Sequence, residues 1–138
     1  MARKFNNVTF PDELRLKYPL GAGKTSGVKD WHLEADFRVF WTENGIEKHH
    51  TAEAGLVTDM SSTPWWAQWV PQLQKAQRMV RASIVHDDLY GNRLINGWKR
   101  IDADDLFYAM LRQQGVWWLQ ANLIYRAVRI GGERVWLT

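Results

Sequence analysis

The chain has 138 residues, of which 46% are hydrophobic and 24% charged, and its formal net charge is +3. These values fit one globular domain over residues 1–138 and exclude a disordered tail, a collagen-like repeat and a coiled coil. The absence of cysteine excludes disulfides, thiolate metal sites and cysteine nucleophiles.

No apolar run approaches the roughly 18 residues of a membrane-spanning helix, so no transmembrane segment is expected. The first residues lack the apolar stretch of a signal peptide, and we therefore expect synthesis in the cytoplasm without an export signal. The basic residues are dispersed, and neither a groove-reading motif nor an RNA-binding signature is present. No specific nucleic-acid partner is expected.

The first part of the chain, residues 1–58, has the patterns of antiparallel strands. The segment Glu13–Tyr18 alternates, and Trp31–Trp41 alternates over part of its length and is rich in aromatic and branched residues. Asn44-Gly45 is a strong hairpin signal. It predicts a return strand over Ile46–Thr51.

The second part, residues 64–132, has helical patterns. The predicted helices run from about Leu73 to Tyr90, from a cap at Asp102 to Gln113, and from Val116 to Arg129, where Gly131-Gly132 closes the last helix. N-terminal antiparallel strands with a hairpin, followed by a C-terminal three-helix region, predict an α+β fold.

The densest group of polar side chains lies in the first two predicted helices. His86 and Tyr90 are four residues apart and share a helix face. The short connection to the next helix can bring Asp104 or Asp105 opposite His86. A histidine with a carboxylate partner is a competent general base near neutral pH, and Asp87 is available to hold a divalent cation. The alternative is a salt-bridged helix pair in which His86 is a buried structural residue.

Three loop or strand segments offer weaker candidates. Asp59 lies at the junction of the two parts, where it either caps a turn or points into a site, and Ser62 is a further polar candidate. Together with His86 and Asp87, the adjacent His49 and His50 resemble the H…HD…D pattern of metal phosphohydrolases. Neighbouring strand residues face opposite sides, however, so His49 and His50 are not expected to bind one metal together. Gly21–Gly27 lacks the full phosphate-binding pattern, so we interpret it as a surface loop and expect no nucleotide.

Tryptophans near basic residues form a candidate interface. Pro64 opens a short predicted turn, after which the aromatic residues approach a basic helix stripe. Tryptophans beside basic residues are typical of a surface that binds anionic lipid. The alternative is that the same tryptophans are buried in the core. The residues of this candidate interface are Trp65, Trp66, Trp69, Arg78 and Arg81.

A set of segments with fixed order and spacing extends over roughly residues 30–132: Gly55–Pro64, Ala82–Tyr90, Ala103–Phe107, Gly115 and Tyr125–Gly131. In these segments the chain resembles a phage and prophage family of small proteins of unknown function. The resemblance implies a viral origin more than a mechanism. The family's proteins are typically encoded near tail or lysis genes.

The pattern His86-Asp87-x-x-Tyr90, followed by Asp104 in Ala-Asp-x-x-Phe, resembles the catalytic helix pair of secretory-type phospholipases A2, above all the cysteine-free versions in parvovirus capsid proteins. That resemblance implies that His86 activates water, Asp87 binds calcium, Asp104 orients the histidine and Tyr90 supports Asp104. The glycine-rich calcium loop of that family is absent upstream, and Asp59 with the backbone of Met60 would replace it.

Two functions follow from these patterns. The first is a metal-assisted hydrolase of a cell-envelope ester or amide, with phospholipid as the first expected substrate, peptidoglycan as the second, and calcium or another divalent cation as cofactor. The second is a non-catalytic phage structural or tail-accessory protein whose polar cluster is structural. Expected partners are other virion proteins or the cell envelope, with peripheral lipid contact, and the expected location is the host cytoplasm or the virion.

Overall fold

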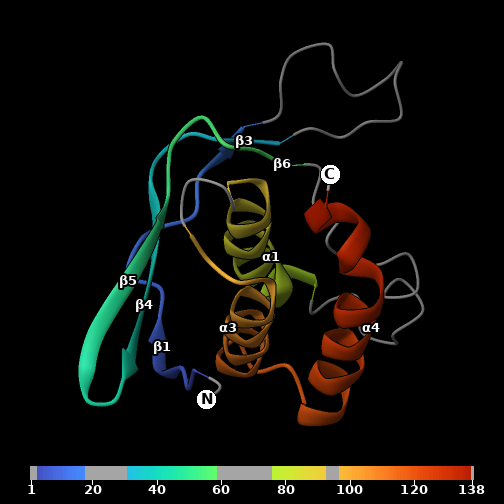
Figure 1. Ribbon diagram of the computed structural model, residues 1–138. Coiled ribbons are helices and arrows are strands. Elements are labelled where there is room, and N and C mark those ends of the chain that lie inside the picture. The colour runs from blue at the N-terminus through green and yellow to red at the C-terminus, as the bar shows by residue number, and fades with distance from the viewer. Residues whose placement is uncertain (1–2, 18–30, 59–75, 93–96, 138) are drawn as a thin grey trace.

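The computed structural model describes residues 3–17, 31–58, 76–92 and 97–137, and in these ranges the strands precede the helices (Figure 1). The described strands are β1 Asn6–Thr9, β2 Leu16–Lys17, β3 Trp31–Leu33, β4 Phe37–Glu43, β5 Ile46–Ala52 and β6 Val57–Thr58. The described helices are α1 Ala76–Gly91, α3 Arg100–Gln113 and α4 Trp118–Leu137. This order confirms the predicted α+β fold class.

The strands form two antiparallel sheets within the described residues. One sheet has the order β1-β4-β5 and the other the order β2-β3-β6. The β4–β5 hairpin turns at Asn44 and Gly45, whose φ angles of 49° and 77° are the left-handed values that a tight two-residue turn requires. The hairpin prediction is therefore confirmed, and Phe37 lies opposite Ala52 at its far end.

The Trp31–Trp41 segment, which alternates over part of its length, forms two strands and not one continuous strand, because the chain turns a corner between β3 and β4 and these belong to different sheets. The corner is held by distant residues. The Asp36 carboxylate accepts a hydrogen bond from the backbone N–H of Ala54 at 2.8 Å. The backbone N–H of Glu34 donates to the carbonyl of Arg15 at 2.9 Å. Side-chain alternation does not reveal such bonds.

Two helix ends differ from their predicted positions. The expectation that Asp102 caps a helix is wrong, because α3 begins at Arg100 and its N-cap is Lys99, which makes no side-chain capping bond. Asp102 lies in the first turn, where its negative charge is favourable to the helix dipole. The expectation that Gly131-Gly132 closes the last helix is also wrong, because α4 continues to Leu137.

Helices α1 and α3 lie between the β1-β4-β5 sheet and α4 (Figure 1). One buried cluster joins these layers, with Phe37, Val39 and Trp41 of β4 facing the helices at every second position. Because α1 is covered on opposite sides, both Ile84 and His86, which lie about 200° apart around the helix, are buried. None of the described helices is long and apolar enough to span a membrane.

Candidate functional site

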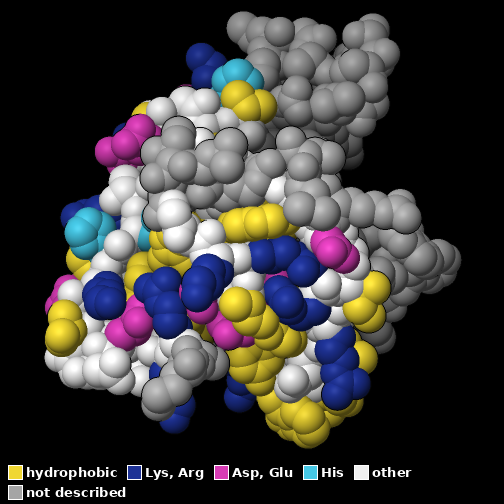
Figure 2. All heavy atoms as spheres, in the orientation of Figure 1, with side chains coloured by type: hydrophobic (Ala, Val, Ile, Leu, Met, Phe, Trp, Pro, Cys, Tyr) yellow, Lys and Arg dark blue, Asp and Glu magenta, His cyan; other side chains and the backbone are white. Residues whose placement is uncertain are grey.

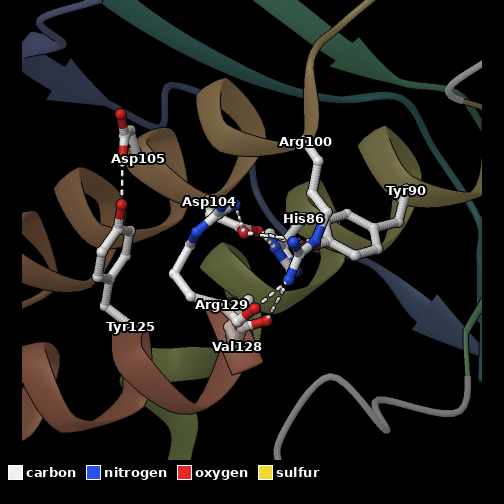
Figure 3. A network of polar contacts seen from close by, with 8 residues as sticks. All are labelled: His86, Tyr90, Arg100, Asp104, Asp105, Tyr125, Val128 and Arg129. Atoms are coloured by element: carbon white, nitrogen blue, oxygen red, sulfur yellow. Dashed lines mark hydrogen bonds and ion pairs between the residues drawn. The ribbon is translucent and has the colours of Figure 1, made fainter. Parts of the chain in front are cut away.

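His86 of α1 and Asp104 of α3 form a buried pair, as their spacing predicted (Figure 3). His86 Nε2 lies 2.8 Å from Asp104 Oδ1. His86 is 3% exposed and Asp104 is fully buried. The imidazole also packs against two rings, with centroid distances of 4.3 Å to Tyr90 and 4.5 Å to Phe107. The histidine is thus fixed in position and orientation.

Two further side chains bind the Asp104 carboxylate. Tyr90, one turn after His86 on α1, donates its hydroxyl hydrogen to Oδ1 at 2.6 Å. Arg129 of α4 donates from Nη1 to Oδ2 at 2.8 Å. Burial alone raises the pKa of Asp104, but the hydrogen bonds from His86, Tyr90 and Arg129 together hold this pKa below its ordinary value. Asp104 is therefore a carboxylate that joins three helices.

Arg100 ties the same region to the backbone of α4. Its Nη2 donates to the carbonyl oxygen of Val128 at 3.1 Å and also to that of Arg129. Its Nε lies 4.0 Å from Asp104 Oδ2. Sequence reasoning missed both arginines, although Arg100 is four residues before Asp104 on one helix face, a spacing that could have indicated it. No local pattern indicates Arg129, which lies 25 residues from Asp104.

The ionised Asp104 determines which nitrogen of His86 carries a proton. A carboxylate only accepts hydrogen bonds, so Nε2 must be the donor. In the neutral ring, Nδ1 then holds the unshared electron pair. Among the described residues this buried Nδ1 atom has no hydrogen-bond partner, and the same is true of Ser83 Oγ, one turn earlier on α1. The sequence alone did not indicate Ser83.

Asp105 has a different partner from Asp104. The hydroxyl of Tyr125 donates to Asp105 Oδ1 at 2.6 Å, on the other side of Arg129 from the histidine (Figure 3). Burial, followed by the hydrogen bond to Asp105, raises the pKa of Tyr125 to about 12. Of the two carboxylates that the spacing left open, the structure therefore brings Asp104, and not Asp105, to His86.

A second, partly buried histidine–carboxylate pair lies on the opposite side of α1. His50 Nε2 of β5 is 2.5 Å from Asp88 Oδ2, and Asn92 Nδ2 donates to Asp88 Oδ1 at 2.7 Å. Sequence reasoning missed Asp88, which is two residues after His86 and therefore about 200° away around the helix. His49 points to the other side of the sheet and stacks on Phe40 at 5.3 Å. The phosphohydrolase pattern is consequently not assembled.

The proposed cation ligands remain a prediction. Asp87 is half-buried on α1, while Asp59 lies outside the described residues. In the described ranges, no group of three or more histidine, aspartate or glutamate side chains is arranged to hold a metal ion. Ser62 and the Gly21–Gly27 loop also lie outside the described residues.

The candidate tryptophan interface falls mostly outside the described ranges, which do not include Trp65, Trp66 or Trp69. Arg78 lies in the first turn of α1. Arg81, one turn further, donates from Nη1 to Gln114 Oε1 at 3.4 Å, at the end of α3. Arg81 is thus placed near the connection between α3 and α4.

A family model described as a protein of unknown function, DUF1353, matches residues 31–128. This range covers most of the chain, including both strands of the hairpin and the residues of the Asp104 network up to Val128. The chain therefore belongs to this uncharacterised family. No curated protein and no solved structure matches it.

Proposed function

We propose that the protein is a phage-encoded hydrolase that cleaves an ester or amide of the cell envelope, with His86 as its general base. One observation carries this proposal: Asp104 binds the Nε2 side of the imidazole, so the basic lone pair is on Nδ1, which has no partner among the described residues. A fixed tautomer with an unused lone pair is what general-base catalysis requires.

In this reaction a water molecule gives a proton to His86 Nδ1 while its oxygen attacks the carbonyl carbon of the substrate. Asp104 stays ionised and stabilises the imidazolium, while Tyr90 and Arg129 keep the carboxylate in place. The imidazolium then returns the proton to the leaving oxygen or nitrogen. The products are an acid and an alcohol or amine.

Ser83 is the proposed second contact of that water. Its Oγ is buried and lacks a partner among the described residues, and it lies one helical turn before His86. Buried polar atoms without protein partners are commonly satisfied by an ordered water. A water held by Ser83 Oγ would lie on the same side of α1 as the imidazole.

Calcium or another divalent cation belongs to the proposal, with Asp87 and Asp59 as ligands. When bound, such a cation would offset the negative charge that develops on the substrate carbonyl oxygen. The described residues alone provide no metal-binding group. The proton transfers given above use only the substrate water and side chains of this chain.

Phospholipid is the first proposed substrate and peptidoglycan the second. The support is the resemblance of the His86-Asp87-x-x-Tyr90 pattern to phospholipases A2, in which the three linked side chains act together. Here His86, Tyr90 and Asp104 are in direct contact. Other virion proteins or the cell envelope are the proposed partners, and the host cytoplasm or the virion is the proposed location.

A non-catalytic phage structural or tail-accessory protein is the second candidate. It is favoured by the burial of His86 Nδ1, which a water can reach only through an opening in the packed side chains. It is also favoured by Arg129, since a carboxylate bound by an arginine, a tyrosine and a histidine joins three helices without any catalysis. In that case the Asp104 network is structural, and its function is to hold the three helices together.

The two histidine–carboxylate pairs allow a matched experiment. His86→Gln keeps a side-chain N–H that can reach Asp104 but removes the basic nitrogen, and His50→Gln makes the same change at Asp88. Hydrolysis of phospholipid vesicles and of peptidoglycan is measured with and without calcium, beside thermal melting. We expect both variants to melt lower than the wild type and only His86→Gln to lose hydrolysis.

Absence of hydrolysis by the wild-type chain on both substrates, with and without calcium, would contradict the hydrolase. If His86→Gln and His50→Gln lose the same fraction of activity, and each loss follows from the variant's lower stability, the result would contradict the role of His86 as general base. Either result favours the structural protein.

A further inference from the structure

The start of α4 carries an exposed apolar surface. Trp117 is 53% exposed, Trp118 52%, Leu119 41% and Leu123 51%. Figure 2 shows hydrophobic side chains gathered over the first turns of α4, at the lower edge of the molecule, with basic side chains beside them. Two neighbouring tryptophans and two leucines in contact with water are a larger apolar group than scattered surface residues provide.

Helix α4 has two apolar sides. Ala121, Ile124 and Val128 are buried against the rest of the protein. On the outer side, Leu123 and Ile130, which is 82% exposed, are seven residues apart and thus on one stripe. The outer stripe therefore does not contribute to the packing of α4 on the rest of the protein.

Basic residues surround this surface. Arg81 reaches the end of α3 through Gln114, and Arg112 donates to the carbonyl oxygen of Val116, just before the exposed tryptophans. Arg126 is exposed one turn after Leu123. The sequence contains no aspartate or glutamate from position 106 to position 132. An apolar surface with arginines and without acidic residues fits a negatively charged partner.

We propose that the surface formed by Trp117, Trp118, Leu119 and Leu123 binds an anionic lipid bilayer, with α4 lying along the membrane surface. Tryptophan side chains favour the boundary between headgroups and acyl chains, while arginines are attracted to anionic headgroups. A second copy of this chain fits less well, because a two-fold contact of the patch with itself would bring Arg112 and Arg126 of both copies together without acidic partners. The binding does not require the proposed hydrolase activity.

The test is sedimentation of the full chain with vesicles of phosphatidylcholine alone or mixed with an equal amount of phosphatidylglycerol. We expect binding to the mixed vesicles that weakens with added salt. The double variant Trp117→Ala/Trp118→Ala should bind at least roughly tenfold more weakly, since about half of each large apolar side chain is available to the membrane. Arg126→Gln should weaken binding roughly fivefold.

Ile46→Ala is the matched control, because Ile46 is 62% exposed at the tip of the hairpin, away from α4. It should bind like the wild type, and Ile46→Ala, Arg126→Gln and the double variant should each keep the wild-type melting temperature. His86→Gln should also bind normally, which separates this proposal from the hydrolase. Wild-type chain that does not sediment with anionic vesicles, or a double variant that binds equally well, overturns the proposal. A dimer that the double variant abolishes, without vesicle binding, would assign the surface to a second copy instead.

Discussion

Tyr90 of α1 fills the space in which a side chain at position 132 of α4 would stand. A Cβ atom at Gly132 would lie 2.7 Å from Tyr90 Oη and 3.3 Å from Tyr90 Cε2. The phenol is held there, because it donates to Asp104 at 2.6 Å and packs edge-on against Trp136 at 5.0 Å. The glycine therefore permits the close approach of two helices within a continuing helix.

This contact predicts opposite effects for two adjacent substitutions. Gly131→Ala places its Cβ in open space and should stabilise the protein by up to about 1 kcal/mol, because alanine favours helix. Gly132→Ala should destabilise it by roughly 1–3 kcal/mol through the clash with Tyr90. Denaturant titration measures both. In a Tyr90→Phe background, Gly132→Ala should lower the free energy of unfolding by less. An unchanged loss of stability would show that the phenol oxygen does not cause the clash.

Asp104→Asn should destabilise the protein by roughly 3–5 kcal/mol at pH 7, because it removes a buried charge that Arg129 and His86 bind. The pKa of Asp104 is lower in the folded than in the unfolded chain. Its ionised form therefore adds stability at pH values above about 4, and this contribution is lost as the pH falls through the lower folded pKa. Denaturant titrations between pH 7 and pH 3 should show the two proteins converging.

Asp102→Asn is the control for that experiment, since Asp102 lies two residues earlier in the first turn of the same helix and is only partly buried. It should cost about 0.3–1 kcal/mol through the helix dipole. Equal destabilisation by the two substitutions would contradict the assignment of Asp104 as the centre of the network.

Ser83→Ala separates stability from activity. Ser83 Oγ is buried without a protein partner among the described residues, so its removal breaks no hydrogen bond to them and should leave the melting temperature nearly unchanged. If Ser83 holds the attacking water, the same variant should hydrolyse the substrate at least roughly tenfold more slowly. A lower melting temperature together with full activity would contradict the proposed role.

Tyr125 should ionise late in an alkaline absorbance titration. Its pKa is raised to about 12, so the neutral phenol adds stability that is fully present below the ordinary value of about 10 and is lost as the pH rises through about 12. The signal that Tyr125→Phe removes identifies its midpoint. Asp105→Asn should move that midpoint toward 10, because it removes the negative charge beside the hydroxyl. A midpoint near 10 in the wild type would contradict the Asp105 contact.

Calcium should raise the melting temperature if Asp87 and Asp59 hold a cation. A ligand that binds only the folded chain stabilises it by about 2.7 kcal/mol at 100 times its dissociation constant. Asp87→Asn and Asp59→Asn should each abolish the calcium effect, whereas Asp102→Asn should keep it. Identical melting with calcium and with a chelator would remove the cation from the proposed mechanism.

Several features of the fold could be predicted because they depend on neighbouring residues. Asn44-Gly45 adopts left-handed backbone angles at little cost, so the hairpin follows from two residues. His86 and Tyr90 share a helix face because of the helical period, and the short connection to the next helix placed Asp104 within reach of both. The order of strands and helices, and with it the fold class, follows from the same local periodicities.

Other features depended on how the elements pack, and no local pattern could reveal them. The choice of Asp104 over Asp105 depends on the rotation of α3 between α1 and α4, which sends Asp105 to Tyr125. Arg129 binds Asp104 because α4 packs against α3, and His50 binds Asp88 because β5 packs against α1. Both contacts join elements that are distant in sequence.

The glycine pair Gly131-Gly132, within α4, shows the difference most directly. The sequence by itself determined that positions 131 and 132 carry no side chain. Two glycines are compatible both with the end of a helix and with a close contact between two helices. Only the tertiary structure decided between them. Tyr90, held by Asp104, occupies the space beside Gly132, and α4 continues past the glycines to Leu137.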